Sequence, residues 1–346
     1  MKAGSPRLKS LNDVKRQSIR LSQASLVKTR PVEEGKRLLL VEPSAETIDL
    51  AAWARDNRSW IEEHLLRHGG LLFRGFALPD AAAFQEVASA VSPDLLDYVE
   101  RAAPRSQVAG KVFTSTEYPA DQWIPLHHEM SYSHNWPTKL YFYCDIPAEE
   151  QGYTPVADDL EIFARIPQAI KDRFMEKGVM YVRNYGQGAD MPWWEVFQTR
   201  SKQEVEAYLA STKTEYEWRG QDQLRTRMRR QVTATHPKTG DTVWFNHAHM
   251  FHSSNMPTAV RAALRREFKD DELPRNAFYG DGSPIEDEVA QAVRDLYRES
   301  ALYFLWQKGD VLLLDNFLTS HGRSPFKGQR KIYVAMAELY TNPEFR

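Results

Sequence analysis

The sequence predicts a mainly β fold with helical insertions, either a β-sandwich or a jelly roll decorated by helices. Short apolar and aromatic segments bounded by turn residues recur along the chain, for example at 140–144 and 311–316, as is typical of buried strands. Segments with helical periodicity lie in groups rather than alternating one for one with the strands, which argues against a βαβ fold. No glycine-rich phosphate loop and no Gly-x-Ser-x-Gly motif is present.

Composition limits the classes of function. The 346 residues are 42% hydrophobic, enough to form the core of one large domain. The formal net charge is -2, so neither nucleic acid nor an anionic membrane is an expected partner. No apolar run reaches the roughly 20 residues of a membrane span. Cys144 is the single cysteine, which excludes an intrachain disulfide and favours a reducing, cytoplasmic location.

The N-terminal segment is strongly basic. Residues 1–37 hold ten Lys or Arg against three acids, and they lack the apolar stretch of a signal peptide. We interpret this segment as a mobile basic arm, with a transit peptide as the alternative. The single domain then covers 38–346, with helical insertions at about 158–230 and 258–300.

Elements in the first third of the domain are marked by their caps. Ser44 is a candidate N-cap for a helix that runs to Leu66, and Gly69 follows where a residue with positive φ often ends a helix. Leu71–Phe73 reads as a buried strand. Asp80 then caps a second helix with an apolar face.

The later elements follow the same signals. Gly178 stops one helix, and Ser201 with Glu204 has the spacing of a capping box at the start of another. Predicted strands are 140–144, 154–157, 179–185, 231–235, 242–246, 311–316 and 331–337, and predicted helices are 159–166, 167–177, 259–268 and 285–299.

A His-x-Glu pair is the first candidate for chemistry. On a strand, the side chains of His127 and Glu129 would share one face while that of His128 points away. Two imidazoles and one carboxylate form the facial triad that leaves positions open on Fe(II). Alone, the motif is weak, because a histidine near a solvated glutamate is far more common.

The third ligand candidate lies far downstream. His321 follows a turn at Gly309 and a buried strand at 311–316. Only a folded barrel or sandwich would bring His321 to Glu129. A lone histidine at a strand end is more often a structural residue, so the surrounding sequence decides between the two interpretations.

Three blocks, at 124–132, 151–158 and 315–330, occur in the order found in the Fe(II)/2-oxoglutarate oxygenases of the taurine dioxygenase and clavaminate synthase type. The chain resembles this family over roughly 60–338. The resemblance implies a double-stranded β-helix (jelly-roll) core and a requirement for Fe(II), 2-oxoglutarate and O2. Residues 129–133 with Trp136-Pro137, and residues 319–323, are similar to the syringomycin-type aspartyl hydroxylase branch. The chain departs from that branch at His128 and at Gln151 to Tyr153.

The resemblance implies roles for individual residues. His127, Glu129 and His321 would be the iron ligands, and Arg330 would pair with the distal carboxylate of 2-oxoglutarate beside the hydroxyl of Thr154. The planar fork of an arginine suits a carboxylate because it donates two parallel hydrogen bonds. Because Glu129 is present, hydroxylation is favoured over halogenation, since related halogenases lack the carboxylate.

The expected substrate is an amino acid or an amino-acid-derived molecule in specialised-metabolite biosynthesis, either free or tethered to a peptidyl carrier protein. Another small carboxylate or sulfonate is the alternative. Candidate substrate contacts are Tyr132, Asn246, His249 and Arg323, where Arg323 has co-substrate and structural roles as alternatives. A non-catalytic jelly-roll binding protein is the alternative outside enzymes, although all four residues of the implied centre are present.

Three further clusters have two interpretations each. His247, His249 and His252 form a weak candidate zinc site, but a cavity wall or core packing fits them better. The aromatic stretch at 192–197 is either a lid or the core of an insertion. The arginine run at 225–230 is a solvated face or, with the basic arm, a surface for a carrier protein.

Overall fold

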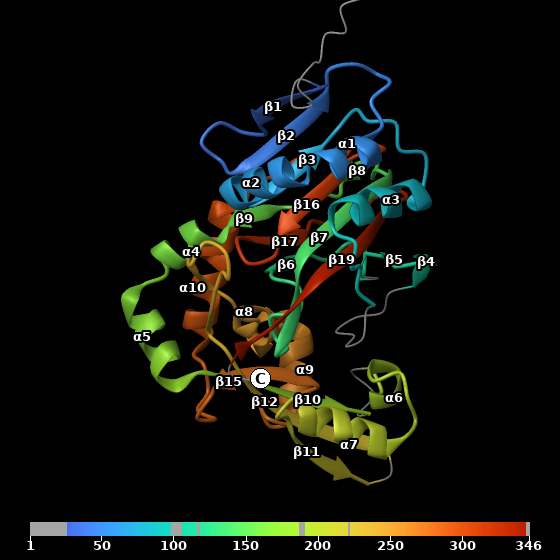
Figure 1. Cartoon of the computed structure of the whole chain (residues 1–346). Helices are drawn as coiled ribbons and strands as arrows, with labels where there is room; N and C mark the ends of the chain where they lie inside the picture. The colour runs from blue at the N-terminus through green and yellow to red at the C-terminus, as the bar shows by residue number, and fades with distance from the viewer. Residues whose placement is uncertain (1–25, 98–105, 116–117, 187–190, 221, 344–346) are drawn as a thin grey trace, which may run out of the picture.

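The computed structural model describes residues 26–97, 106–115, 118–186, 191–220 and 222–343 (Figure 1). An eight-stranded sheet forms its largest part, and its central strands are apolar on both faces, as expected for a sheet covered on both sides. Val311–Asp315 is buried at every position. The strand order is β1 (Val27–Pro31), β2 (Leu38–Pro43), β3 (Gly70–Phe73), β16 (Val311–Asp315), β7 (Asn135–Ile146), β19 (Lys331–Thr341), β5 (Val112–Thr114) and β4 (Gln107–Ala109).

Helices from the N-terminal part of the chain cover one face of this sheet. They are α1 (Leu50–Asp56), α2 (Arg58–His68) and α3 (Ala81–Val91). Trp53 and Phe84 pack with Tyr143 and Leu313 in one core cluster. The caps at Gly69, with φ of 67°, and at Asp80 are confirmed. The helix expected from Ser44 is instead two helices, and the first is capped by the side chain of Asp49.

A three-stranded sheet carries the chemistry. Its order is β6 (Ile124–His127), β17 (Thr319–Arg323) and β9 (Val156–Asp158), and it lies beside the large sheet in Figure 1. The ring centroids of Phe142 on β7 and His321 on β17 are 5.0 Å apart. The site described below therefore lies where the two sheets meet.

The two expected insertions are not purely helical, and they join in one layer. The first contributes β10 and β12 and the second contributes β15, which pairs with β10. The resulting sheet lies at the end of the molecule opposite β1 and β2 (Figure 1). Its order is β11 (Glu215–Arg219), β12 (Gln223–Arg230), β10 (Val179–Tyr185) and β15 (Arg275–Tyr279).

The remaining elements surround this layer and the site. They are α4 (Asp159–Arg165), α5 (Gln168–Lys177), α6 (Trp193–Val196), α7 (Lys202–Ser211), α8 (Ala248–Phe251), a 3-10 turn (Ser253–Asn255), α9 (Thr258–Glu267), α10 (Asp287–Ser300), the hairpin β13 (Thr233–Thr235) and β14 (Thr242–Trp244), and the pair β8 (Glu150–Gln151) and β18 (Phe326–Lys327). The capping box is confirmed, because Glu204 N donates to Ser201 Oγ. The mainly β class with added helices is confirmed as well.

The expected boundary of the N-terminal arm at residue 37 is wrong. Val27–Pro31 forms β1, which pairs antiparallel with β2 over five residues. Its exposed and charged positions hide this edge strand from a search for apolar runs, since only Val27 is buried. The rest of the expected arm, residues 1–25, lies outside the described residues. Within the part of the chain that the structure describes, no helix is long and apolar enough to cross a bilayer.

Candidate metal centre

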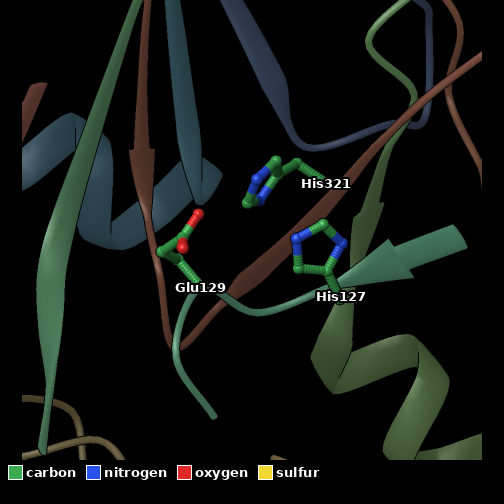
Figure 2. A group of neighbouring side chains, drawn as sticks. All are labelled: His127, Glu129 and His321. Atoms are coloured by element: carbon green, nitrogen blue, oxygen red, sulfur yellow. The ribbon is translucent and has the colours of Figure 1, made fainter. Parts of the chain in front are cut away.

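Three side chains from two strands and a turn converge on one point. His127 ends β6, and its partner directly across the antiparallel pair is His321 on β17. Directly paired residues place their side chains on the same face, and the two ring centroids are 4.6 Å apart. One ligand atom from each of His127, Glu129 and His321 lies within 4.8 Å of the others, and Figure 2 shows the three groups pointing toward one another.

Glu129 reaches this point differently from the strand alternation that the sequence predicted. β6 ends at His127, and Glu129 lies in the turn that follows, where Met130 has φ of 60°. A methionine in the left-handed region is uncommon, so the surrounding contacts must hold this turn.

Asn316 holds the turn through its side chain. Its Oδ1 accepts a hydrogen bond from Glu129 N at 2.8 Å, and its Nδ2 donates to Glu129 O at 3.0 Å and to Pro137 O at 2.8 Å. Asn316 is fully buried, so these bonds are shielded from water and fix the backbone that carries the carboxylate.

We expect Asn316→Ala to lower metal affinity by about 10- to 100-fold, the usual effect of removing a residue that supports a ligand. Isothermal titration calorimetry with Mn(II) measures this loss of metal affinity. Asn255→Ala, a change in a half-buried asparagine outside the centre, is the control. Unchanged Mn(II) affinity in a folded Asn316→Ala protein would show that the turn does not need this clamp.

The ring of His127 is oriented for metal binding. Its Nδ1 lies 2.8 Å from Pro125 O, and since a carbonyl only accepts, Nδ1 carries the proton. The lone pair of the neutral ring is then on Nε2. Two imidazoles and one carboxylate suit a divalent transition metal with open positions, so the donor set fits iron.

His128 points to the opposite side, as expected. Its Nδ1 donates to Asn316 O at 2.7 Å, and its Nε2 lies 3.0 Å from Asp159 Oδ1. Tyr297 Oη also donates to this carboxylate, at 3.0 Å. All of these groups are buried, so His128 and Asn316 together attach the metal-site turn to the end of β16 and the start of α4.

A small cavity extends from the two histidines toward a half-buried cation, Arg330. His127, His321, Thr154 and Arg330 all line it. Arg330 Nη2 donates to Thr154 Oγ1 at 3.2 Å and Nε donates to Gly152 O at 3.1 Å, and Trp306 Nε1 also donates to Thr154 Oγ1, at 3.0 Å. Burial lowers the pKa of Arg330 to about 10, with a further contribution from Arg323. The guanidinium is therefore charged at neutral pH, and the cavity joins a metal site to a fixed cation.

Two of the candidate substrate residues already have structural contacts. Arg323 donates to the carbonyl oxygens of Tyr118, Pro119 and Gln122, which favours the structural alternative. Asn246 Nδ2 donates to Val232 O, and Asn246 Oδ1 accepts a hydrogen bond from Ala248 N.

The other two candidates lie near the centre. His249 Nε2 donates to Leu126 O at 2.8 Å, and burial lowers the pKa of His249 to about 3, so the ring is neutral. Tyr132 is buried and packs edge-to-face against His247, whose ring is 5.4 Å from that of His127. The sequence singled out His249 and Tyr132 as substrate contacts, but it gave no sign that the ring of His247 lies next to that of His127.

The structure bears on the three clusters that had two interpretations each. The only group there with metal-binding geometry is His127, Glu129 and His321, so the histidine cluster forms no separate zinc site. Trp193 is buried in a cluster with Tyr185 and Leu224, which favours core packing for the aromatic stretch. The arginine run is β12, where Arg225 pairs with Asp271 and Arg229 pairs with Glu215.

These features define a class of protein. A model of the family described as taurine catabolism dioxygenase TauD, TfdA family matches residues 24–336, and the chain belongs to this family. It is a dioxygenase, and the expected dependence on iron and 2-oxoglutarate is confirmed by this membership.

The chain is also similar to individual proteins of known sequence or structure. The chain is 41% identical to the dapdiamide synthesis protein DdaC of Enterobacter agglomerans over 285 residues, which cover 82% of the chain and 87% of that protein. It is 30% identical to a clavaminate synthase-like protein of Arabidopsis thaliana over 295 residues, which cover 82% of the chain and 86% of that protein. The crystal structure of PvcB from Pseudomonas aeruginosa is similar in fold, with a TM-score of 0.52 at 15% identity over 92% of the chain and 94% of PvcB.

Proposed function

We propose that the protein is an Fe(II)/2-oxoglutarate-dependent hydroxylase of an amino acid or amino-acid-derived substrate, active in the biosynthesis of a specialised metabolite. His127, Glu129 and His321 hold the iron, and Arg330 with Thr154 holds the distal carboxylate of 2-oxoglutarate. The observation that carries the proposal is the cavity at the metal centre, which has two of the three ligands and the half-buried Arg330 cation on its wall. The meeting of the two sheets at this cavity supports a jelly-roll core.

The bound iron and 2-oxoglutarate supply the activation of oxygen. The chain supplies position and charge. Arg330 offers a planar fork for one carboxylate of the co-substrate, and Thr154 keeps that fork in place through its hydrogen bond. Phe142 and Val334 line the same cavity, so apolar side chains limit the access of water to the reacting groups.

A biosynthetic substrate is supported by the 41% identity to a protein named for dapdiamide synthesis. Tethering to a carrier protein is the second form of the same proposal. The arginine run gives that form little support, because Arg225 is buried and Arg229 is already paired with Glu215. A carrier would need another surface. A sulfonate substrate is the alternative that the family description suggests.

Succinate release distinguishes these forms. The iron-loaded protein is supplied with 2-oxoglutarate and O2, and then with free amino acids, the same amino acids loaded on a peptidyl carrier protein, or taurine. We expect an amino acid, free or loaded, to raise succinate release well above the substrate-free rate and to gain one oxygen by mass spectrometry. Stimulation by taurine alone would contradict the amino-acid proposal.

A further inference from the structure

A second cavity also borders β6. Its volume is about 420 Å³, and its walls come from the segment before β6, from Leu126, from residues 255–258 and from α10. β6 is the edge strand of its sheet, so this cavity borders the free edge of the strand that ends at His127. None of the residues that line it lines the metal cavity.

Arg294 forms a charged part of the cavity wall. Only 4% of this residue is exposed, and its guanidinium donates to His249 O, Ser254 Oγ and Gln291 Oε1 at 2.8 to 2.9 Å. All of these partners are neutral. Burial lowers the pKa of Arg294 and the nearby Arg298 lowers it further, whereas Asp295 and Asp287 act in the opposite direction without contacting the guanidinium.

A buried charge without a counter-charge is costly. Among the residues that the structure describes, no carboxylate forms an ion pair with Arg294, whereas Arg298, one turn further along α10, pairs with Asp295. Among the described residues that line the cavity, Asp121 is the only acid, and it lies there with these two arginines, so the cavity favours an anion beside Arg294.

The rim of the cavity is aromatic. Trp123 is 50% exposed and Tyr303 is 41% exposed, and their rings meet edge-to-face with centroids 6.4 Å apart. Exposed aromatic side chains beside a cavity are typical of binding sites for flat apolar groups.

We propose that this cavity binds a small organic anion with a planar apolar body, whose charged group pairs with Arg294 and whose flat body packs against Trp123 and Tyr303. The anion forms an ion pair with Arg294, which no carboxylate among the described residues does. Because Leu126, which lines the cavity, precedes His127 directly, an occupant contacts the strand that positions this ligand.

The test is calorimetric binding of benzoate and its neutral analogue benzamide. The protein is first saturated with Mn(II) and 2-oxoglutarate, which occupies Arg330. We expect benzoate to bind at least tenfold more tightly than benzamide. Arg294→Gln, which keeps hydrogen-bond donors but not the charge, is expected to weaken benzoate binding at least tenfold and to leave benzamide unchanged. Arg266→Gln, at an exposed position on α9, is the control.

A second variant, with the opposite expected effect on benzoate affinity, keeps the test valid if Arg294→Gln does not fold. Asp121→Asn removes the exposed acid at the cavity and is expected to tighten benzoate binding about two- to threefold. Equal binding of benzoate and benzamide to the wild-type protein would overturn the proposal, as would unchanged benzoate binding in both variants.

Enzyme kinetics with the substrate found in the succinate assay show whether the natural anion is part of that substrate or a separate metabolite. If the cavity holds part of that substrate, benzoate raises KM and leaves kcat unchanged. If it holds a separate metabolite, benzoate changes kcat. Both kinetic results presuppose that benzoate binding depends on Arg294, as the calorimetry tests. They therefore show which ligand the cavity takes, and they do not test whether the cavity binds an anion.

Discussion

Glu129→Ala is expected to abolish substrate-dependent succinate release and to lower metal affinity by more than the roughly 10- to 100-fold that loss of a supporting residue costs. The carboxylate is one of only three groups whose ligand atoms meet at the centre, and it is the only anion among them. Its removal leaves two neutral imidazoles, which bind a divalent cation more weakly. Calorimetric titration with Mn(II) and succinate assays of the iron-loaded variant measure both effects.

Two further variants make this result specific. Glu129→Asp keeps a carboxylate on a shorter side chain and is expected to restore part of the metal affinity. Glu176→Ala, at an exposed position on α5, should match the wild-type protein. Full hydroxylation by a folded Glu129→Ala protein would show that the carboxylate is not a ligand.

Arg330→Gln is expected to raise the KM for 2-oxoglutarate about 30-fold or more, with a smaller effect on the KM for the organic substrate. Truncating one partner of a buried, hydrogen-bonded charge pair costs about 2–5 kcal/mol, and each 1.4 kcal/mol is about a tenfold change in affinity. Initial rates of succinate release across a 2-oxoglutarate series measure the change.

The matched variants again separate charge from geometry. Arg330→Lys keeps the charge but loses the fork, so we expect an intermediate KM. Lys331→Gln changes the neighbouring exposed cation and should leave KM unchanged. If Arg330→Gln leaves the KM for 2-oxoglutarate at the wild-type value, the co-substrate carboxylate binds elsewhere.

The parts of the fold that the sequence predicted are those with local signals. Gly69, Asp80 and Ser201 act at the helix ends where their side chains or φ preferences place them. Of the four-stranded sheet of the insertions, the sequence predicted only β10, which follows the helix stop at Gly178. Strand β12 carries four arginines whose burial follows no regular alternation, and β10 and β15 come from different insertions. Their pairing depends on tertiary contacts that periodicity does not encode.

The candidate site likewise has a part that the sequence predicted and a part that it did not. The pairing of His127 with His321 follows from two motifs and the family resemblance, and the structure brings both residues together with Glu129. The hydrogen bonds from Asn316 that hold the turn of Glu129 join segments far apart in sequence, so no local pattern shows them. Arg294 likewise looks like an ordinary helix arginine until burial and the absence of an ion pair are known.

The most direct test of the central claim is the visible charge-transfer band of the anaerobic protein with Fe(II) and 2-oxoglutarate. The account predicts that a band appears only when both are present, that it is lost in His321→Ala, and that in Arg330→Gln it needs much higher 2-oxoglutarate. A wild-type protein that binds both compounds without any such band would contradict chelation of the co-substrate at a metal held by His127, Glu129 and His321.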